Sequence, residues 1–239
     1  VEGGEPWVDG EVVAMSGTRT IPDQHRTILR WNGLTLSRSY VDAGAGYVMG
    51  NPQASISGSA AIFDRYDAQS GEMGVMSGGQ YDVLAVKDVT KMPGLGNARF
   101  NKFYDYPLVD WSGQDALFMG YGSQLQGLFK RVDGGALQNV ADNTTEIPSS
   151  GGDVFRIFSE SQKALANGQV VFQALGQFSL VGLYTDVGGE LSVLVDNQTN
   201  NEINGEVITS MELANRSFAY TPDGYVVVFK VDYASGDSA

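Results

Sequence analysis

Short apolar stretches separated by glycine-containing turns recur along the whole chain. Apolar residues stand at consecutive positions in Val170-Val171-Phe172 and Val226–Phe229, and such stretches are flanked by Asp-Gly, Asn-Gly or Gly-Gly pairs. These pairs readily adopt the positive φ that two-residue hairpin turns need. No stretch of about 11 residues or more shows a helical apolar period, and the best candidate, Ser159–Ala166, ends at an Asn-Gly pair. The pattern therefore predicts an all-β chain.

The pattern repeats with a period close to 55 residues. Corresponding residues of the two clearest copies are Gly113 and Gly168 (55 apart), Gly127 and Gly182 (55 apart), and Asp142 and Asp196 (54 apart). The turn glycines of five copies are Gly10, Gly58, Gly113, Gly168 and Gly224, at steps of 48, 55, 55 and 56. The 31 glycines of the 239 residues, about twice the usual share, are largely the turns of this repeat.

Each repeat is predicted to form four short antiparallel strands, which is typical of a propeller blade. We expect one propeller domain over residues 1–239 with about five four-stranded blades, the last of them incomplete. The predicted repeats are approximately 5–50, 51–104, 105–160, 161–215 and 216–239 (partial). A β-solenoid usually has a shorter period, and a β-sandwich would not predict a repeat.

The fifth repeat has room for two strands, or for three if 207–220 contains one. Three explanations stay open: a polypeptide that continues, a truncated blade, or completion by another chain. An open blade edge carries unpaired backbone groups and tends to recruit a strand. A homo-oligomer formed through this blade is therefore among the expected partners.

The repeat resembles one found in secreted bacterial proteins, many of which carry C-terminal sorting signals. The third repeat carries Gly134-Gly-Ala-Leu-Gln-Asn-Val-Ala-Asp-Asn-Thr-Thr-Glu-Ile-Pro148, followed by Phe155-Arg-Ile-Phe158. The second repeat keeps Met92-Pro93 with Phe100-Asn-Lys-Phe103, whereas the fourth has Ile203-Asn204 where proline would stand. The resemblance is strong over 105–235 and faint over 1–60. It implies a secreted or surface-located propeller-like protein and no catalytic residues.

Composition and charge exclude several classes. The chain has 15 Lys plus Arg against 28 Asp plus Glu, a net charge of −13, which argues against a nucleic-acid-binding protein. It has no Cys and one His, so a thiolate metal site, a disulfide scaffold and a His-rich metal centre are excluded. No apolar run approaches the roughly 18 residues of a membrane span.

A basic loop around the single histidine is the one candidate for catalysis. His25 lies close in sequence to Arg19 and Arg26. Such a group suits a polysaccharide lyase, in which His25 acts as general base or acid and Arg19 or Arg26 neutralises a uronate carboxylate. The alternative is a solvated loop histidine.

Aromatic residues fall into two groups. Those at equivalent repeat positions are expected in the core: Phe63, Phe118, Phe172 and Phe229. Those that break the repeat are candidates for stacking on sugar rings: Trp7, Trp31, Trp111, Tyr104 and Tyr106. The densest group is Tyr104–Trp111, which is predicted to form a contact surface.

Recurrent acidic residues are expected to cap turns and strand ends. Asp42, Asp88, Asp142 and Asp196 occupy equivalent repeat positions. No cofactor is expected, although the acidic loops 142–146 and 196–202 are compatible with calcium without having EF-hand spacing.

The sequence leads to three hypotheses on function. The favoured one is a secreted, non-catalytic module that binds an extracellular glycan or protein or assembles at the cell surface. The second is the lyase, or another enzyme acting on an acidic polysaccharide. The third is a structural subunit completed by strand pairing with a neighbouring chain. A secreted or cell-surface location is expected from the resemblance and the acidic composition.

Overall fold

The computed structural model describes two kinds of segment. For residues 7–9, 12–18, 26–31, 36–41, 48–49 and 53–54 it describes the backbone alone. For residues 60–67, 69–104, 106–110, 112–148, 150–177, 179–198 and 201–236 it describes backbone and side chains, apart from the side chains of 214–216. The described segments contain β-strands and no helix, and the strands form five antiparallel sheets.

The strands of each sheet are consecutive in the chain. Sheet 1 contains β1 (Trp7–Asp9), β2 (Val12–Thr18), β3 (Arg26–Trp31) and β4 (Leu36–Val41). Sheet 2 contains β5 (Val48–Met49), β6 (Gln53–Ala54), β7 (Ala61–Tyr66), β8 (Gly71–Ser77) and β9 (Gln80–Val86). Sheet 3 contains β10 (Lys102–Phe103), β11 (Leu108–Val109), β12 (Ala116–Gly122), β13 (Leu125–Arg131) and β14 (Gln138–Asp142). Sheet 4 contains β15 (Ile157–Ala166), β16 (Gln169–Leu175), β17 (Val181–Thr185) and β18 (Ser192–Asp196). Sheet 5 contains β19 (Glu202–Ile203), β20 (Glu206–Thr221) and β21 (Gly224–Tyr233).

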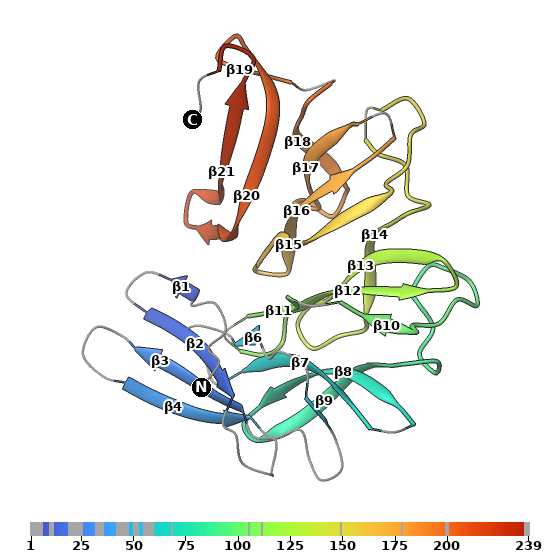
Figure 1. The fold of residues 1–239 in the computed structure, drawn as a ribbon, viewed down its shortest axis with the longest axis vertical. Helices are drawn as coiled ribbons and strands as arrows, with labels where there is room; N and C mark the ends of the chain where they lie inside the picture. The colour runs from blue at the N-terminus through green and yellow to red at the C-terminus, as the bar shows by residue number, and fades with distance from the viewer. Residues whose placement is uncertain are drawn as a thin grey trace.

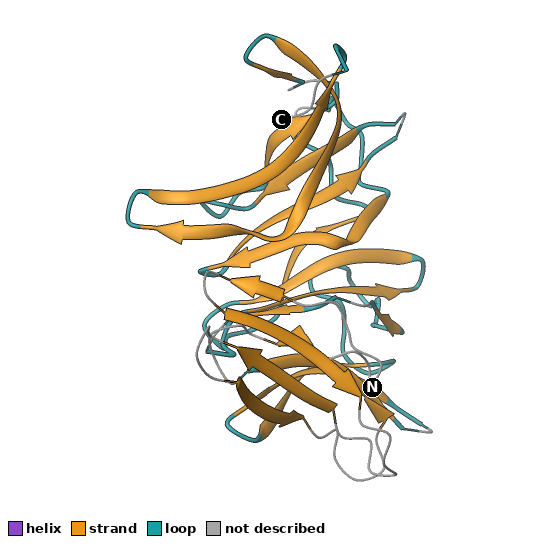
Figure 2. Cartoon of the chain, turned by 60° about the vertical axis from the view of Figure 1, so that its left-hand side comes forward, coloured by secondary structure: helices purple, strands orange, loops and turns teal. Residues whose placement is uncertain are grey.

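The five sheets follow one another in chain order around an arc (Figure 1). Figure 2 shows the same sheets lying over one another from the N-terminal to the C-terminal end of the chain. The predicted all-β, propeller-like fold is confirmed. Sheet 5 is the incomplete one: β20 covers the predicted strand at 207–220, and the described residues place no strand beyond β21.

Sheets 3 and 4 bury both of their faces, because a neighbouring sheet packs on either side. In β12, Phe118 belongs to the core between sheets 2 and 3, whereas Leu117 and Met119 belong to the core between sheets 3 and 4. All three side chains are fully buried. Successive residues of a strand point to opposite faces, so a strand covered on both faces needs an uninterrupted apolar run. This explains the consecutive apolar positions in the sequence.

The repeat builds the same aromatic cluster twice. In one, the rings of Phe100, Phe103, Phe118 and Phe129 lie 4.8 to 6.0 Å apart between centroids. In the other, the rings of Phe155, Phe158, Phe172 and Tyr184 lie 4.8 to 5.9 Å apart. The clusters explain why the Phe-x-x-Phe pairs recur. The predicted core residues Phe63, Phe118 and Phe172 are buried, and Phe229 is partly buried against the core between sheets 4 and 5.

The turn glycines dock one sheet onto the preceding one. Gly168 has a φ of +70° in the turn between β15 and β16, and a Cβ atom there would lie 2.6 Å from Cγ1 of Val132 in the segment after β13. Gly113 has a φ of +80°, and a Cβ atom there would lie 3.1 to 3.3 Å from side chains of β8 and of the residue just before β7. Glycine is therefore required both for the backbone conformation and for the close approach of the sheets.

Two neighbouring cations of β13 connect three sheets. Lys130 Nζ lies 2.6 Å from Asp186 Oδ2, just after β17, and donates to the carbonyl oxygen of Gly168 at 2.7 Å. Arg131 pairs with Asp82 of sheet 2 and donates from Nη2 to the Gly113 carbonyl at 2.8 Å. The Lys130–Asp186 pair is the enclosed one, since each side chain is only 10% exposed while Asp82 is 65% exposed. The turn glycines thus also provide acceptors for these cations.

We expect Gly168→Ala to lower the free energy of unfolding by about 2–4 kcal/mol, because it combines a positive φ with a clash against Val132. The matched control is Gly78→Ala, also at positive φ but with open space around it, which should cost only about 1 kcal/mol. Urea denaturation of both variants measures the difference. Equal losses in the two variants would contradict the docking role of Gly168.

Tyr184 differs from its counterpart Phe129 by one hydroxyl group. This oxygen is buried without a hydrogen-bond partner, and burial, followed by the charges of Asp196 and Asp153, raises the pKa of the phenol. Because an unsatisfied buried hydroxyl is costly, Tyr184→Phe should raise the free energy of unfolding by about 1 kcal/mol. Tyr81→Phe should have the opposite effect, since Tyr81 Oη donates to backbone carbonyl oxygens. A loss of stability in Tyr184→Phe, measured by thermal unfolding, would refute this account.

Candidate functional site

The residues predicted for the lyase lie largely outside the described segments. His25 and Arg19 are outside them, and Arg26 is described only as the first backbone position of β3. The lyase hypothesis therefore stays a prediction from the sequence.

For three of the five predicted aromatic contact residues, the structure likewise describes no side chain. Trp111 lies outside the described residues, and Trp7 and Trp31 are described only as backbone positions at the start of β1 and the end of β3. Tyr104 and Tyr106 are the two whose side chains the structure places.

Tyr104 and Tyr106 follow β10 and have different surroundings. The Tyr104 ring is half-buried against the core between sheets 3 and 4, and Lys102 Nζ lies 4.6 Å from the ring centroid. Burial, with smaller contributions from Glu160 and Tyr121, raises the pKa of the Tyr104 phenol. Tyr106 is 38% exposed and has a φ of 60°, which non-glycine residues seldom adopt. Tyr104 is partly a packing residue, whereas Tyr106 presents an aromatic surface to solvent.

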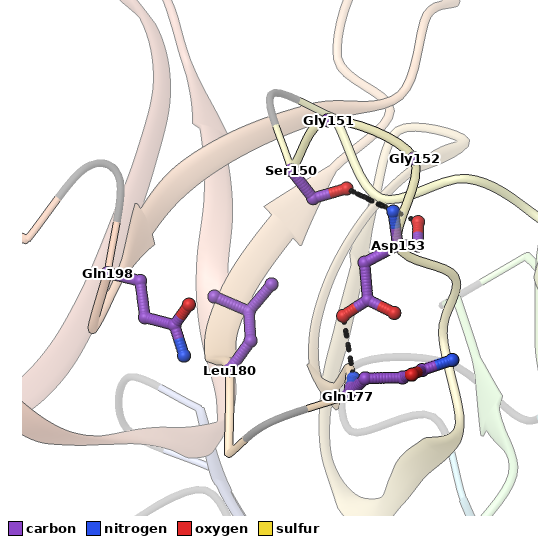
Figure 3. Close-up of a pocket in the computed structure, with 7 residues that line it drawn as sticks. All are labelled: Ser150, Gly151, Gly152, Asp153, Gln177, Leu180 and Gln198. Atoms are coloured by element: carbon purple, nitrogen blue, oxygen red, sulfur yellow. Dashed lines mark hydrogen bonds between the residues drawn. The ribbon is translucent and has the colours of Figure 1, made fainter.

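A polar hollow with a volume of about 280 Å³ lies at loops joined to sheet 4 (Figure 3). Its lining comes from three places: the β14–β15 connection, the β16–β17 connection and the segment after β18. The lining residues are Ser150, Gly151, Gly152, Asp153, Gln177, Leu180 and Gln198.

Asp153 holds two of these loops in place. Its Oδ2 accepts a hydrogen bond from the Gln177 backbone N–H at 2.7 Å, and its Oδ1 accepts one from the backbone N–H of Val154 at 2.8 Å. Ser150 Oγ accepts from the Asp153 N–H at 3.0 Å and donates to the Ile147 carbonyl at 2.8 Å. Gly151 and Gly152 have φ values of 74° and 110°, so the loop between Ser150 and Asp153 depends on glycine. The rim of the hollow is thus built by local hydrogen bonds.

The chemistry of the lining suits a small hydroxyl-bearing ligand. Carboxylate, amide and hydroxyl groups offer both donors and acceptors, and the lining also includes Leu180, a buried residue of the core between sheets 3 and 4. Small-molecule sites usually enclose roughly 300–1,000 Å³ and are lined mainly by apolar side chains with a few polar groups. This hollow is slightly smaller, and polar and glycine residues make up most of its lining.

Sequence reasoning missed the hollow, although one signal was present. The loops Met92–Ala98 and Ile147–Asp153 are equivalent, because in each the first residue donates its N–H to the carbonyl of the last, at 2.8 and 2.7 Å. Asp153 therefore breaks the repeat at the position where the preceding copy has Ala98. Gln177 and Gln198 gave no comparable signal, since only the folded loops bring them together.

Of the four recurrent acidic residues, Asp142 and Asp196 bind groups of their own loops, and Asp42 lies outside the described residues. Asp142 Oδ1 accepts hydrogen bonds from the N–H and hydroxyl of Thr144, at 2.7 and 2.5 Å. Asp196 Oδ1 accepts from the Gln198 N–H at 2.7 Å. In the part of the chain that the structure describes, no three His, Cys, Asp or Glu side chains gather into a metal-binding group, and no helix could cross a membrane.

Comparisons with other proteins leave the family open. No family model matches the sequence, and no curated protein matches it. Several solved structures are similar over most of the chain at low identity. A prolyl endopeptidase has a TM-score of 0.42 and 11% identity, with 98% of this chain and 31% of that chain covered, so this chain spans less than a third of its length. The SapL1 lectin in complex with alpha methyl fucoside has a TM-score of 0.38 and 11% identity, with 93% and 68% covered. A putative 6-phosphogluconolactonase from Bacteroides fragilis has a TM-score of 0.33 and 11% identity, with 98% and 67% covered.

Proposed function

We propose that this protein is a secreted, non-catalytic binding module that recognises an extracellular glycan. The observation that carries the proposal is the polar hollow at sheet 4, which brings together Asp153, Gln177 and Gln198. Sugar rings are surrounded by hydroxyl groups, and such a lining offers them hydrogen-bond donors and acceptors. The resemblance to secreted bacterial repeat proteins supports the extracellular location.

The partly exposed ring of Tyr106 is a separate candidate contact for a glycan. Lys102 stands beside the Tyr104 ring in the same segment, and Glu160 acts electrostatically on Tyr104, so charged and aromatic groups are close together. Aromatic rings stack on sugar rings, and neighbouring charged groups bind hydroxyls or carboxylates. We assign this segment a supporting role, because it forms no described hollow.

Calorimetric titration with glycans selected on a glycan array tests the proposal. We expect Gln177→Ala and Gln198→Ala each to weaken binding about fivefold, since each removes a hydrogen-bonding side chain worth about 1 kcal/mol. Gln138→Ala is the matched control, because Gln138 is an exposed glutamine of β14 that does not line the hollow. The bound glycan should be recovered uncleaved.

The possible failures of this experiment are distinct. If Tyr106→Ala abolished binding while both hollow variants bound normally, the ligand would lie at the tyrosine segment and the assignment of the hollow would be wrong. If no glycan bound, or if the glycan were cleaved, the proposed function itself would be contradicted.

A further inference from the structure

The outer face of sheet 5 is exposed where the equivalent faces of sheets 3 and 4 are covered. Leu117, Val171 and Val228 each precede the equivalent phenylalanine of their repeat. Leu117 and Val171 are 0% and 1% exposed because the next sheet packs on them, whereas Val228 is 64% exposed. Val226, two residues earlier on the same face, is 48% exposed. The opposite face of β21 is packed against sheet 4 through residues such as Val231.

One edge of sheet 5 is open, because β21 lacks the partner strand that its equivalents in sheets 3 and 4 have among the described strands. β12 pairs with β13 and β16 pairs with β17, but β21 pairs with β20 alone among the described strands. Its ten residues, Gly224 to Tyr233, contain no proline and one lysine, so few of the usual features that protect an edge strand are present. Sheet 5 therefore presents both an apolar face and an extended edge.

The charges on this face are suited to self-association. The chain carries a net charge of −13, so two copies repel one another over most of their surface. On the outer face of sheet 5, however, Lys230 stands directly opposite Glu212 on β20 and pairs with Asp232 at 3.0 Å. A face that holds charges of both signs beside two valines can meet its own copy across a twofold axis, with Lys230 of each copy near Glu212 of the other.

We propose that the outer face of sheet 5, formed by Val226, Val228, Lys230 and Glu212, binds the same face of a second copy of this chain. Two identical faces would meet in this dimer, whereas within the chain the outer face of one sheet packs on the inner face of the next, and the exposed valines would be covered. The interface is separate from the glycan hollow, so it does not depend on the proposed function.

Sedimentation velocity of the whole chain over a concentration series tests this interface. We expect the wild-type protein to approach twice the 25.6 kDa mass of one chain as its concentration rises. Val228→Lys should shift the dissociation constant at least tenfold towards monomer. Val89→Lys is the matched control, because Val89 is 60% exposed outside sheet 5, and it should dimerise like the wild type.

A charge exchange tests the arrangement of the two copies. Lys230→Glu should weaken the dimer, and adding Glu212→Lys to it should restore the dimer, because the two charges exchange places across the axis. If the double variant dimerised no better than Lys230→Glu alone, the twofold arrangement would be contradicted.

Other outcomes separate this interface from its rivals. A wild-type protein that stays monomeric at all concentrations would overturn the proposal. A monomer destabilised by Val228→Lys would place another part of the same chain on this face and would overturn it equally. Glycan titration of the Val228→Lys variant, expected to match the wild type, keeps the two proposals distinguishable.

Discussion

The packing of one sheet on the next is the constraint on which the rest of this structure depends. A four-stranded sheet has two faces, and in the middle of this chain both are buried by neighbours. Consecutive apolar residues in the strands, glycine at the turns and aromatic clusters between the sheets all serve this packing. The buried pair between Lys130 and Asp186 adds a polar connection, in which the lysine also binds the turn carbonyl of Gly168.

The same constraint divides the residues by role. Those that obey the repeat, such as Phe118 and Phe172, fill the spaces between sheets and cannot be free for a ligand. Asp153, which breaks the repeat, shapes the rim of a hollow instead. The end of the stack is a third kind of surface, where Val228 keeps the residue type of a covered strand but has no described sheet over it. We therefore propose binding at a position where the repeat changes, and assembly at the face of sheet 5 that no described sheet covers.

The sequence predicted the features that recur and missed those that arise from distant contacts. The strands, the turn glycines and the core phenylalanines follow from periodicity, because periodicity reflects the local backbone and the covered faces. Of the hollow, only Asp153 left a signal in the sequence, since Gln177 and Gln198 come near it only after the loops of sheet 4 fold together. The Lys130–Asp186 pair was missed for the same reason, because its two residues are 56 positions apart in the sequence and meet only in the folded chain.

A double-mutant cycle between Lys130 and Asp186 tests most directly whether polar contacts between sheets stabilise the stack. Lys130→Met, Asp186→Asn and the double variant would be compared with the wild type by urea denaturation. Because the pair is largely buried and joins sheets 3 and 4, we expect a coupling energy of about 2 kcal/mol or more. Additive losses, with coupling below about 0.5 kcal/mol, would contradict the account.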